Sequence, residues 1–187
     1  MAHHGFETPW GLWGTLFHLS KGAKHMNRPT LTQYMLEIAK LAATRTTCIR
    51  RGVGCVLVNQ RGHILAVGYN GVAKGMPHCN EPTDDGLCWD TNEPVQVVSG
   101  HACKGHDLPP GQDSCEAVHA EQNALLQCSD PWSVEVAYVT LSPCKACLKL
   151  LLSTSCKRIV VLEEHVDPMP KELWLRSGRE WEVVCAN

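Results

Sequence analysis

Strand-like and helix-like segments alternate along the second half of the 187-residue chain, and this order constrains the fold more than any other feature. Apolar runs rich in β-branched residues lie at 134–141 and 158–162, separated by a helix that starts near Cys144. A helix around 171–177 and a strand at 181–185 follow. Strands that alternate with helices form βαβ units with parallel strands. The alternation therefore predicts an α/β fold with a largely parallel sheet in this half.

The first half predicts a helix followed by a β-hairpin. Thr30-x-x-Gln33 is a capping box that marks the start of the helix. Apolar residues then recur at helical spacing, which predicts a buried face of Leu31, Met35, Ile38, Leu41 and Ala42. The segments 53–59 and 63–70 flank the turn sequence QRG and predict antiparallel strands. All elements together predict a mixed sheet of about five strands flanked by helices.

Two stretches fall outside this regular pattern. Residues 1–25 are rich in Trp, Gly and His without a clear period, so we expect a vector-derived or disordered leader before a single domain at 26–187. The alternative is a native extension that packs on the domain through Trp10, Trp13 and Phe17. Residues 71–114 are rich in Gly, Pro, Cys and His, and so long a loop is either disordered or held by a ligand such as a metal.

Composition narrows the classes of function. A net charge of −2 and a pI near 6.5 lack the basic character of most nucleic-acid-binding proteins, so we expect no stable nucleic-acid partner. No apolar run reaches the roughly 20 residues of a membrane span, which predicts no membrane association. The chain has 11 cysteines, an odd number, and is long enough to form its own core. Metal ligation in a reducing cytoplasm therefore fits better than a disulfide framework.

Two motifs supply the residue types of a catalytic zinc site. The sequences HAE (119–121) and PCKAC (143–147) offer one imidazole and two thiols, and catalytic zinc takes three protein ligands and one water. Both thiols lie in the first turn of a predicted helix, where the helix dipole favours thiolate. Glu121 could then exchange protons with the bound water, whose pKa falls to about 7 in such sites.

Each motif has a simpler interpretation when it is taken alone. A C-x-x-C pair is often a structural zinc site or a redox pair, and a histidine at a helix start is often only a cap. The order of the two motifs, each at the start of a predicted helix, favours one shared catalytic metal.

The motifs resemble those of a known family. HAEQ followed by SPCKAC is similar to the zinc deaminase signature H-x-E…P-C-x-x-C. Within that superfamily, the sequences GYNG, HAEQNALL, YVTLSPCKAC, TRTTCIRRGVGCVLV and GMPHCNE resemble the bacterial and phage branch of the deoxycytidylate (dCMP) deaminases. The resemblance runs from about Leu31 to Val184 and implies a cytidine-deaminase-like, three-layer α/β/α fold.

The resemblance also implies a reaction and its residues. It makes His119, Cys144 and Cys147 the zinc ligands and Glu121 the proton shuttle. Water would attack C4 of cytosine, so that dCMP yields dUMP and ammonia. Allosteric control of this step would regulate the supply of dTTP.

Substrate contacts are implied in the same way. The Ala120 amide would contact the pyrimidine and Asn70 the deoxyribose. Arg50 or Arg51 would bind the 5′-phosphate, although both could equally be solvated surface arginines. His165 stands near the position where relatives often carry a tyrosine beside the phosphate. A second departure is Asp130, just past the catalytic helix, where relatives often carry a basic residue. The two departures leave dCTP or a nucleoside open as the substrate.

The resemblance further implies a second, structural zinc near the long loop. Its candidates are Cys48, Cys79, Cys88, Cys103, Cys115, His78, His101 and His106. We favour Cys48, Cys79 and Cys115 with one histidine such as His101, since a closed four-ligand site would order the loop. Three other cysteines, Cys55, Cys156 and Cys185, are expected in the core.

Regulation and assembly are implied only by the resemblance. Related enzymes are commonly hexamers that dCTP, with Mg²⁺, activates and dTTP inhibits. The turn GYNG (68–71) is where we would expect effector contacts, because glycines let a ligand approach the backbone closely. A plain turn at the end of a strand is the alternative. We expect a cytoplasmic enzyme, in a bacterium or in the host of a phage.

Three other functions compete with dCMP deamination. A tRNA or DNA base deaminase shares the zinc motif but usually has basic patches and stacking aromatics, and aromatic residues are only 6% of this chain. A deaminase of guanine or another small base is the second. A zinc-stabilised binding module without chemistry is the third, and Glu121 argues against it because a closed structural site needs no carboxylate there.

Overall fold

The computed structural model describes residues 28–48, 51–74 and 117–184. Its elements are α1 (Leu31–Ala43), β1 (Gly54–Val58), β2 (Ile64–Tyr69), α2 (Ala120–Gln127), a 3₁₀ turn (Pro131–Ser133), β3 (Val136–Leu141), α3 (Lys145–Leu152), β4 (Arg158–Glu163), α4 (Met169–Arg176) and β5 (Glu180–Val183). The expected hairpin and the alternation of strands and helices are confirmed. The expected leader at 1–25 lies outside the described residues, and so does most of the long loop.

The five strands form one mixed sheet in the order β2-β1-β3-β4-β5. β1 is antiparallel to both β2 and β3, whereas β3, β4 and β5 are parallel to one another. The start of β1 and the end of β2 are paired as Gly54 with Tyr69, and the ends of β3 and β4 as Leu141 with Glu163. All four strand ends therefore lie along one end of the sheet, which we call the carboxyl end.

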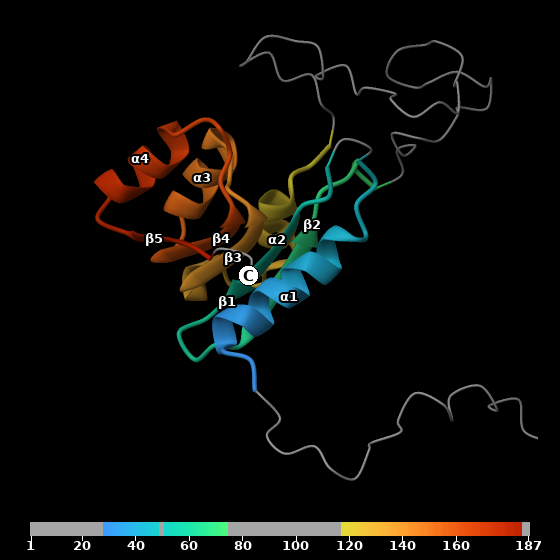
Figure 1. Ribbon diagram of the computed structural model, residues 1–187, viewed down its shortest axis with the longest axis horizontal. Helices are drawn as coiled ribbons and strands as arrows, with labels where there is room; N and C mark the ends of the chain where they lie inside the picture. Colours follow the sequence, from blue (N-terminus) through green and yellow to red (C-terminus); the bar gives the residue numbers. More distant parts are fainter. Residues whose placement is uncertain (1–27, 49–50, 75–116, 185–187) are drawn as a thin grey trace, which may run out of the picture.

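Helices cover both faces of the sheet (Figure 1). On one face, α1 packs Met35, Leu36 and Ala39 against the β1, β3 and β4 side chains of a first core cluster that includes Val56 and Tyr138. On the other face, α2, α3 and α4 contribute to a second cluster through Ala120, Ala124, Leu148, Leu151 and Trp174. The two crossovers β3-α3-β4 and β4-α4-β5 thus place their helices on the same face, as right-handed connections require. The expected three-layer α/β/α architecture is confirmed.

The buried face of α1 differs from the one expected. Met35, Leu36, Ala39 and Ala42 are buried, whereas Leu31 is 51% and Leu41 69% exposed. Met35, Leu36, Ala39 and Ala42 share the side of α1 that packs on the sheet, whereas Leu41 lies about 200° around the helix from Ala39. A Cβ added at Gly54 would lie 1.9 Å from the Ala39 carbonyl oxygen, so β1 has a glycine where α1 approaches it closely.

Two of the cysteines expected in the core are confirmed there. Cys55 in β1 and Cys156 before β4 are both fully buried. Burial raises the pKa of Cys156 to about 12 and holds the pKa of Cys55 well above its usual value. Both therefore remain neutral thiols at physiological pH, and Cys185 lies outside the described residues. None of the helices described is both long and apolar enough to cross a bilayer.

Candidate active site

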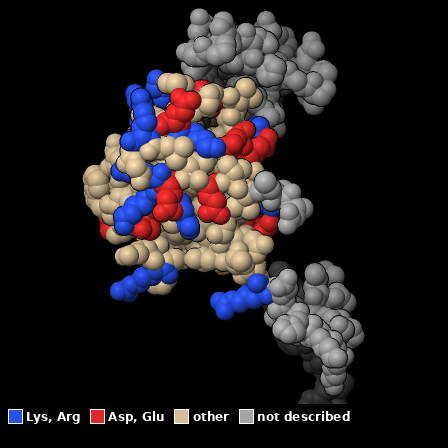
Figure 2. Space-filling model, turned by 60° about the vertical axis from the view of Figure 1, so that its left-hand side comes forward, with Lys and Arg blue, Asp and Glu red and all other residues tan. Residues whose placement is uncertain are grey.

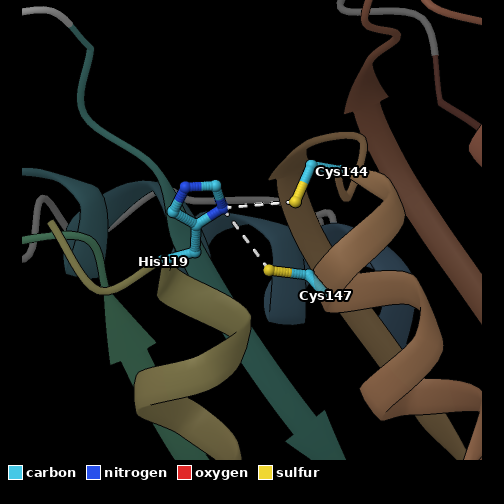
Figure 3. Close-up of side chains that lie close together, drawn as sticks. All are labelled: His119, Cys144 and Cys147. Carbon is cyan, nitrogen blue, oxygen red and sulfur yellow. Dashed lines mark hydrogen bonds between the residues drawn. The ribbon is translucent and has the colours of Figure 1, made fainter. Parts of the chain in front are cut away.

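The imidazole of the HAE motif and both thiols of the PCKAC motif converge at the carboxyl end of the sheet (Figure 3). Nδ1 of His119 lies 3.5 Å from Sγ of Cys144 and 3.4 Å from Sγ of Cys147. These three donor atoms all lie within 4.8 Å of one another, and they form the one such group among the described residues. The side chains come from two helices that lie next to each other on the same face of the sheet.

The donor set fits zinc. With Zn–S of about 2.3 Å and Zn–N of about 2.0–2.1 Å, tetrahedral geometry separates a sulfur from a nitrogen by about 3.6 Å. The observed S···N separations of 3.5 and 3.4 Å are close to that value. One imidazole and two thiols leave a fourth position for water or substrate, as in catalytic zinc sites.

The position of His119 depends on contacts that fix α2 against β2. His119 is the N-cap of α2, and its backbone N–H donates to Oε1 of Gln122 over 2.8 Å. The preceding residue, Val118, exchanges backbone hydrogen bonds of 3.1 and 2.8 Å with Gly71. One turn into α2, Nδ2 of Asn123 donates to the Tyr69 carbonyl over 2.7 Å. The end of β2 therefore holds both the start of α2 and its first turn.

The glycines of GYNG have a structural explanation. A Cβ at Gly68 would lie 2.2 Å from the Ala120 carbonyl oxygen, and one at Gly71 would lie 2.4 Å from Oγ1 of Thr47. Both positions are therefore closed to any side chain by neighbouring protein atoms. This packing accounts for the two glycines without an effector, which stays a prediction.

The two thiols lie at the start of α3. Cys144 is the N-cap of α3 and Cys147 is fully buried in the first turn. A hydrogen bond from the Cys147 thiol lowers the pKa of Cys144 to about 3. The same hydrogen bond, together with burial, raises the pKa of Cys147 well above its usual value. The thiol of Cys144 therefore ionises more readily than that of Cys147, and a bound cation would favour the thiolate form of both, because metal ligation requires deprotonated cysteines.

Glu121 is buried beside this cluster. It is 3% exposed, and desolvation is the largest of the effects that raise its pKa from 4.5 to about 7. A carboxyl group with a pKa near neutrality can both take and give protons at physiological pH. The arrangement therefore places an acid–base group next to a metal-binding cluster.

The other residues expected to contact substrate are scattered along the carboxyl end. Ala120 is fully buried as the first residue of α2. Asn70 is 8% exposed, and its amide already accepts from Val53 N and Thr46 Oγ1 and donates to the carbonyl oxygen of Arg51. His165 is exposed, and its backbone N–H donates to Ser142 Oγ over 2.6 Å.

Some expected site residues cannot be placed. Arg50, Cys79, His101 and Cys115 lie outside the described residues, whereas Cys48 is half-buried just after α1. The backbone N–H of Cys48 donates to Thr46 Oγ1 over 3.1 Å. The second zinc site therefore stays a prediction.

Two residues at the carboxyl end, Asn123 and Glu163, make contacts that the sequence did not predict. Asn123 anchors α2 on β2, and its signal was a polar side chain on the helix face that turns towards the sheet. Glu163, at the end of β4, forms an ion pair with Arg51. No local pattern could have paired these two, because 112 positions separate them in the sequence.

Comparisons with known proteins agree with this geometry. The family model of the cytidine and deoxycytidylate deaminase zinc-binding region matches residues 29–163, which include the metal-binding cluster and Glu121. The deoxycytidylate deaminase of Mycobacterium phage D29 is 36% identical over 140 residues, which are 74% of this chain and 99% of that protein. The deoxycytidylate deaminase of Schizosaccharomyces pombe is 37% identical over 136 residues, and the matched part spans only 37% of that longer protein.

A solved structure shares the fold over most of the chain. The dCMP deaminase of cyanophage S-TIM5, crystallised with dCMP and dUMP, is 25% identical and superposes with a TM-score of 0.60. The superposition covers 86% of this chain and 100% of that one. Together with the family match and the His-Cys-Cys cluster, this similarity shows that the chain belongs to the zinc-dependent cytidine and deoxycytidylate deaminase family.

Proposed function

We propose that the chain catalyses the hydrolytic deamination of dCMP to dUMP and ammonia. The observation that carries this proposal is the buried carboxyl group of Glu121, whose pKa is raised to about 7, next to a His119–Cys144–Cys147 cluster that could hold a metal ion. Substrate identity is supported by the relatives: those from Mycobacterium phage D29 and Schizosaccharomyces pombe are named deoxycytidylate deaminases, and the cyanophage enzyme was crystallised with dCMP and dUMP.

The proposed mechanism divides metal binding and proton transfer between different residues. His119, Cys144 and Cys147 would hold the zinc, which supplies a Lewis acid that makes water nucleophilic at neutral pH. Glu121 takes a proton from the water that adds to C4 of cytosine and passes it to N3. It then passes the second proton of that water to the exocyclic amine, which leaves as ammonia. The oxygen of the water becomes the C4 carbonyl of dUMP, so atoms and protons balance.

The substrate contacts in this proposal are carried over from the family resemblance. The Ala120 backbone, at the start of α2, would contact the pyrimidine, and Asn70 the deoxyribose. Arg51, with Arg50, would bind the 5′-phosphate, and His165 would lie near it. The main alternative is a deaminase that also or mainly acts on dCTP, because the tyrosine often found in relatives near the phosphate is replaced here.

Nucleic-acid bases are less favoured substrates. On the face drawn in Figure 2, Lys and Arg side chains intermingle with Asp and Glu rather than forming a basic stripe. Single-stranded nucleic acid is usually held in a positively charged groove with stacking aromatics. A non-catalytic zinc module is disfavoured by the carboxyl group of Glu121, whose burial costs free energy that a structural site has no need to spend.

The wider properties of the enzyme are part of the same proposal. Residues 26–187 would form one deaminase domain, which is consistent with the family match at 29–163. We propose a homohexamer that dCTP with Mg²⁺ activates and dTTP inhibits, and the support is the family resemblance alone. Thiol ligands must stay reduced, which favours the cytoplasm.

One assay tests the proposed reaction. Ammonia release is measured for the zinc-loaded full chain with dCMP, dCTP, deoxycytidine and single-stranded oligonucleotides. We expect the highest kcat/KM for dCMP and no turnover of oligonucleotides. A preference for dCTP would favour the alternative substrate, and no ammonia from any deoxycytidine compound would overturn the proposed function.

A further inference from the structure

An ion pair joins two distant segments at the carboxyl end of the sheet. Nη2 of Arg51, just before β1, donates to the carboxylate of Glu163, the last residue of β4. Both side chains are about half exposed, 49% for Arg51 and 60% for Glu163. Exposed pairs of this kind contribute little to stability and exchange their partners readily.

Glu163 is linked through its backbone to the segment that leads into the two thiols of the metal-binding cluster. It is paired with Leu141 at the end of β3, and its carbonyl oxygen accepts a hydrogen bond of 2.8 Å from the Ser142 backbone. Ser142 is followed by Pro143 and Cys144, the first cysteine of the cluster. The carboxylate of Glu163 is therefore carried by backbone that borders the start of α3.

Arg51 is tied to the histidine half of the cluster. Its carbonyl oxygen accepts a hydrogen bond of 2.8 Å from Nδ2 of Asn70. Asn70 is followed by Gly71, whose backbone pairs with that of Val118, the residue before His119. The ion pair thus connects the backbone that borders the imidazole with the backbone that borders the thiols.

We propose that Glu163 is the residue that selects nucleotides by the charge of their phosphate group. This inference rests on the proposed deamination of a deoxycytidine nucleotide. In the free enzyme Glu163 holds the Arg51 guanidinium in place. A phosphate carries a charge of about −1.5 to −2 at pH 7 and offers Arg a bidentate partner, so it displaces the carboxylate from Arg51.

The displaced carboxylate then opposes further negative charge. A monophosphate satisfies Arg51, whereas the extra phosphates of a triphosphate bring more negative charge close to Glu163. Repulsion of this kind selects by disfavouring the wrong ligand. The substrate class that fits the pair is therefore the nucleoside monophosphate.

The test compares charge-neutralising variants of the zinc-loaded full chain. Glu163→Gln removes the proposed selector, and Arg51→Gln removes its partner. Glu164→Gln is the matched control: it removes the same charge from the adjacent residue, whose carboxylate accepts from Lys171 Nζ at 2.7 Å and from Trp181 Nε1 at 3.2 Å. The measurements are dUMP binding by calorimetry and the ratio of kcat/KM for dCTP to that for dCMP.

In Glu163→Gln we expect dUMP to bind about two- to fivefold more tightly, because no carboxylate competes for Arg51. The dCTP/dCMP ratio should rise by about two- to fivefold, since the repulsion of the extra phosphates is removed. In the Arg51→Gln background the additional change Glu163→Gln should tighten dUMP binding by clearly less than it does when Arg51 is present, because the competition for Arg51 is lost and only the repulsion between Glu163 and the phosphate remains to be removed. Glu164→Gln should move neither quantity by more than about 1.5-fold, because its charge faces Lys171.

Four results would overturn the inference: an unchanged dCTP/dCMP ratio in Glu163→Gln, unchanged or weaker dUMP binding in Glu163→Gln, an equal change in Glu164→Gln, or a full effect of Glu163→Gln when Arg51 is already replaced. Each can occur in an enzyme that deaminates dCMP normally, so the proposed function would survive. A wild-type chain that releases no ammonia from any deoxycytidine compound would instead overturn both.

Discussion

Burial of the Glu121 carboxyl group raises its pKa towards neutrality, where the group can exchange protons. The residue is 3% exposed, and desolvation is the main reason why its pKa rises to about 7. Glu164, just after β4, shows the opposite behaviour, because a hydrogen bond from Lys171 lowers the pKa of its exposed carboxyl group. The environment, rather than the residue type, separates an acid–base group from a plain surface charge.

Replacement of this carboxyl group gives a direct test. We expect Glu121→Gln to lower kcat on dCMP by about 10²- to 10⁴-fold, because an amide of the same shape cannot carry protons. Zinc content, measured by metal analysis, should stay that of the wild type, since His119, Cys144 and Cys147 are untouched. Retained turnover in this variant would contradict the proposed mechanism.

The short helix α2 owes its position to the strand beside it. Gly68 lets the backbone of α2 approach β2, and Asn123 donates to the Tyr69 carbonyl from the same helix. Helices of eight residues such as α2 are marginal on their own, so the tertiary contacts decide where His119 and Glu121 lie. The active site therefore depends on the packing of one element against another.

A methyl group added at Gly68 tests whether the close contact between α2 and β2 is needed for both stability and kcat. Gly68→Ala would place a Cβ 2.2 Å from the Ala120 carbonyl oxygen and 2.4 Å from Ala124 N, so α2 must shift. We expect the free energy of unfolding to fall by about 1–3 kcal/mol and kcat on dCMP to fall as well, as measured by denaturant titration and ammonia release.

The matched control is Gly178→Ala, where φ is 76° and no neighbouring heavy atom lies within 4 Å of the added Cβ. Its backbone strain should lower stability by about 1–2 kcal/mol while kcat stays unchanged. Equal kcat values for both variants would show that α2 does not need its close contact with β2.

The topology of the whole sheet brings the metal ligands together. His119 enters from the side of β2, and Cys144 and Cys147 enter from the crossover between β3 and β4. β1 lies between β2 and β3 and is antiparallel to both, so the relevant strand ends meet at the carboxyl end. Cys48 lies after α1, close in sequence to the start of β1.

The number of zinc ions bound per chain tests the expected second zinc site. We expect two zinc ions per full-length chain by metal analysis, falling to one in Cys48→Ser and in Cys144→Ser. Loss of the structural ion in Cys48→Ser should lower Tm, because closed zinc sites contribute to folding. One zinc per wild-type chain would refute the second site while leaving the catalytic site intact.

Much of the fold was predictable because its signals are local. The alternation of apolar runs predicted the order of strands and helices, and the Thr30-Gln33 capping box correctly marked the start of α1. The predicted buried face of α1 was partly wrong, with Leu31 and Leu41 exposed, because apolar residues occur on more than one side of this helix and only its packing on the sheet decides which side is buried.

The sequence by itself determined the donor types and their local spacing. Cys144 and Cys147 share one face of one helical turn, and His119 and Glu121 share the start of another, because these relations need only the geometry of a single helix. Only the tertiary structure decided that the two helix starts meet within metal-binding distance, that Glu121 is buried and that Glu163 lies against Arg51. These outcomes depend on sheet topology and desolvation, which arise from residues far apart in the chain.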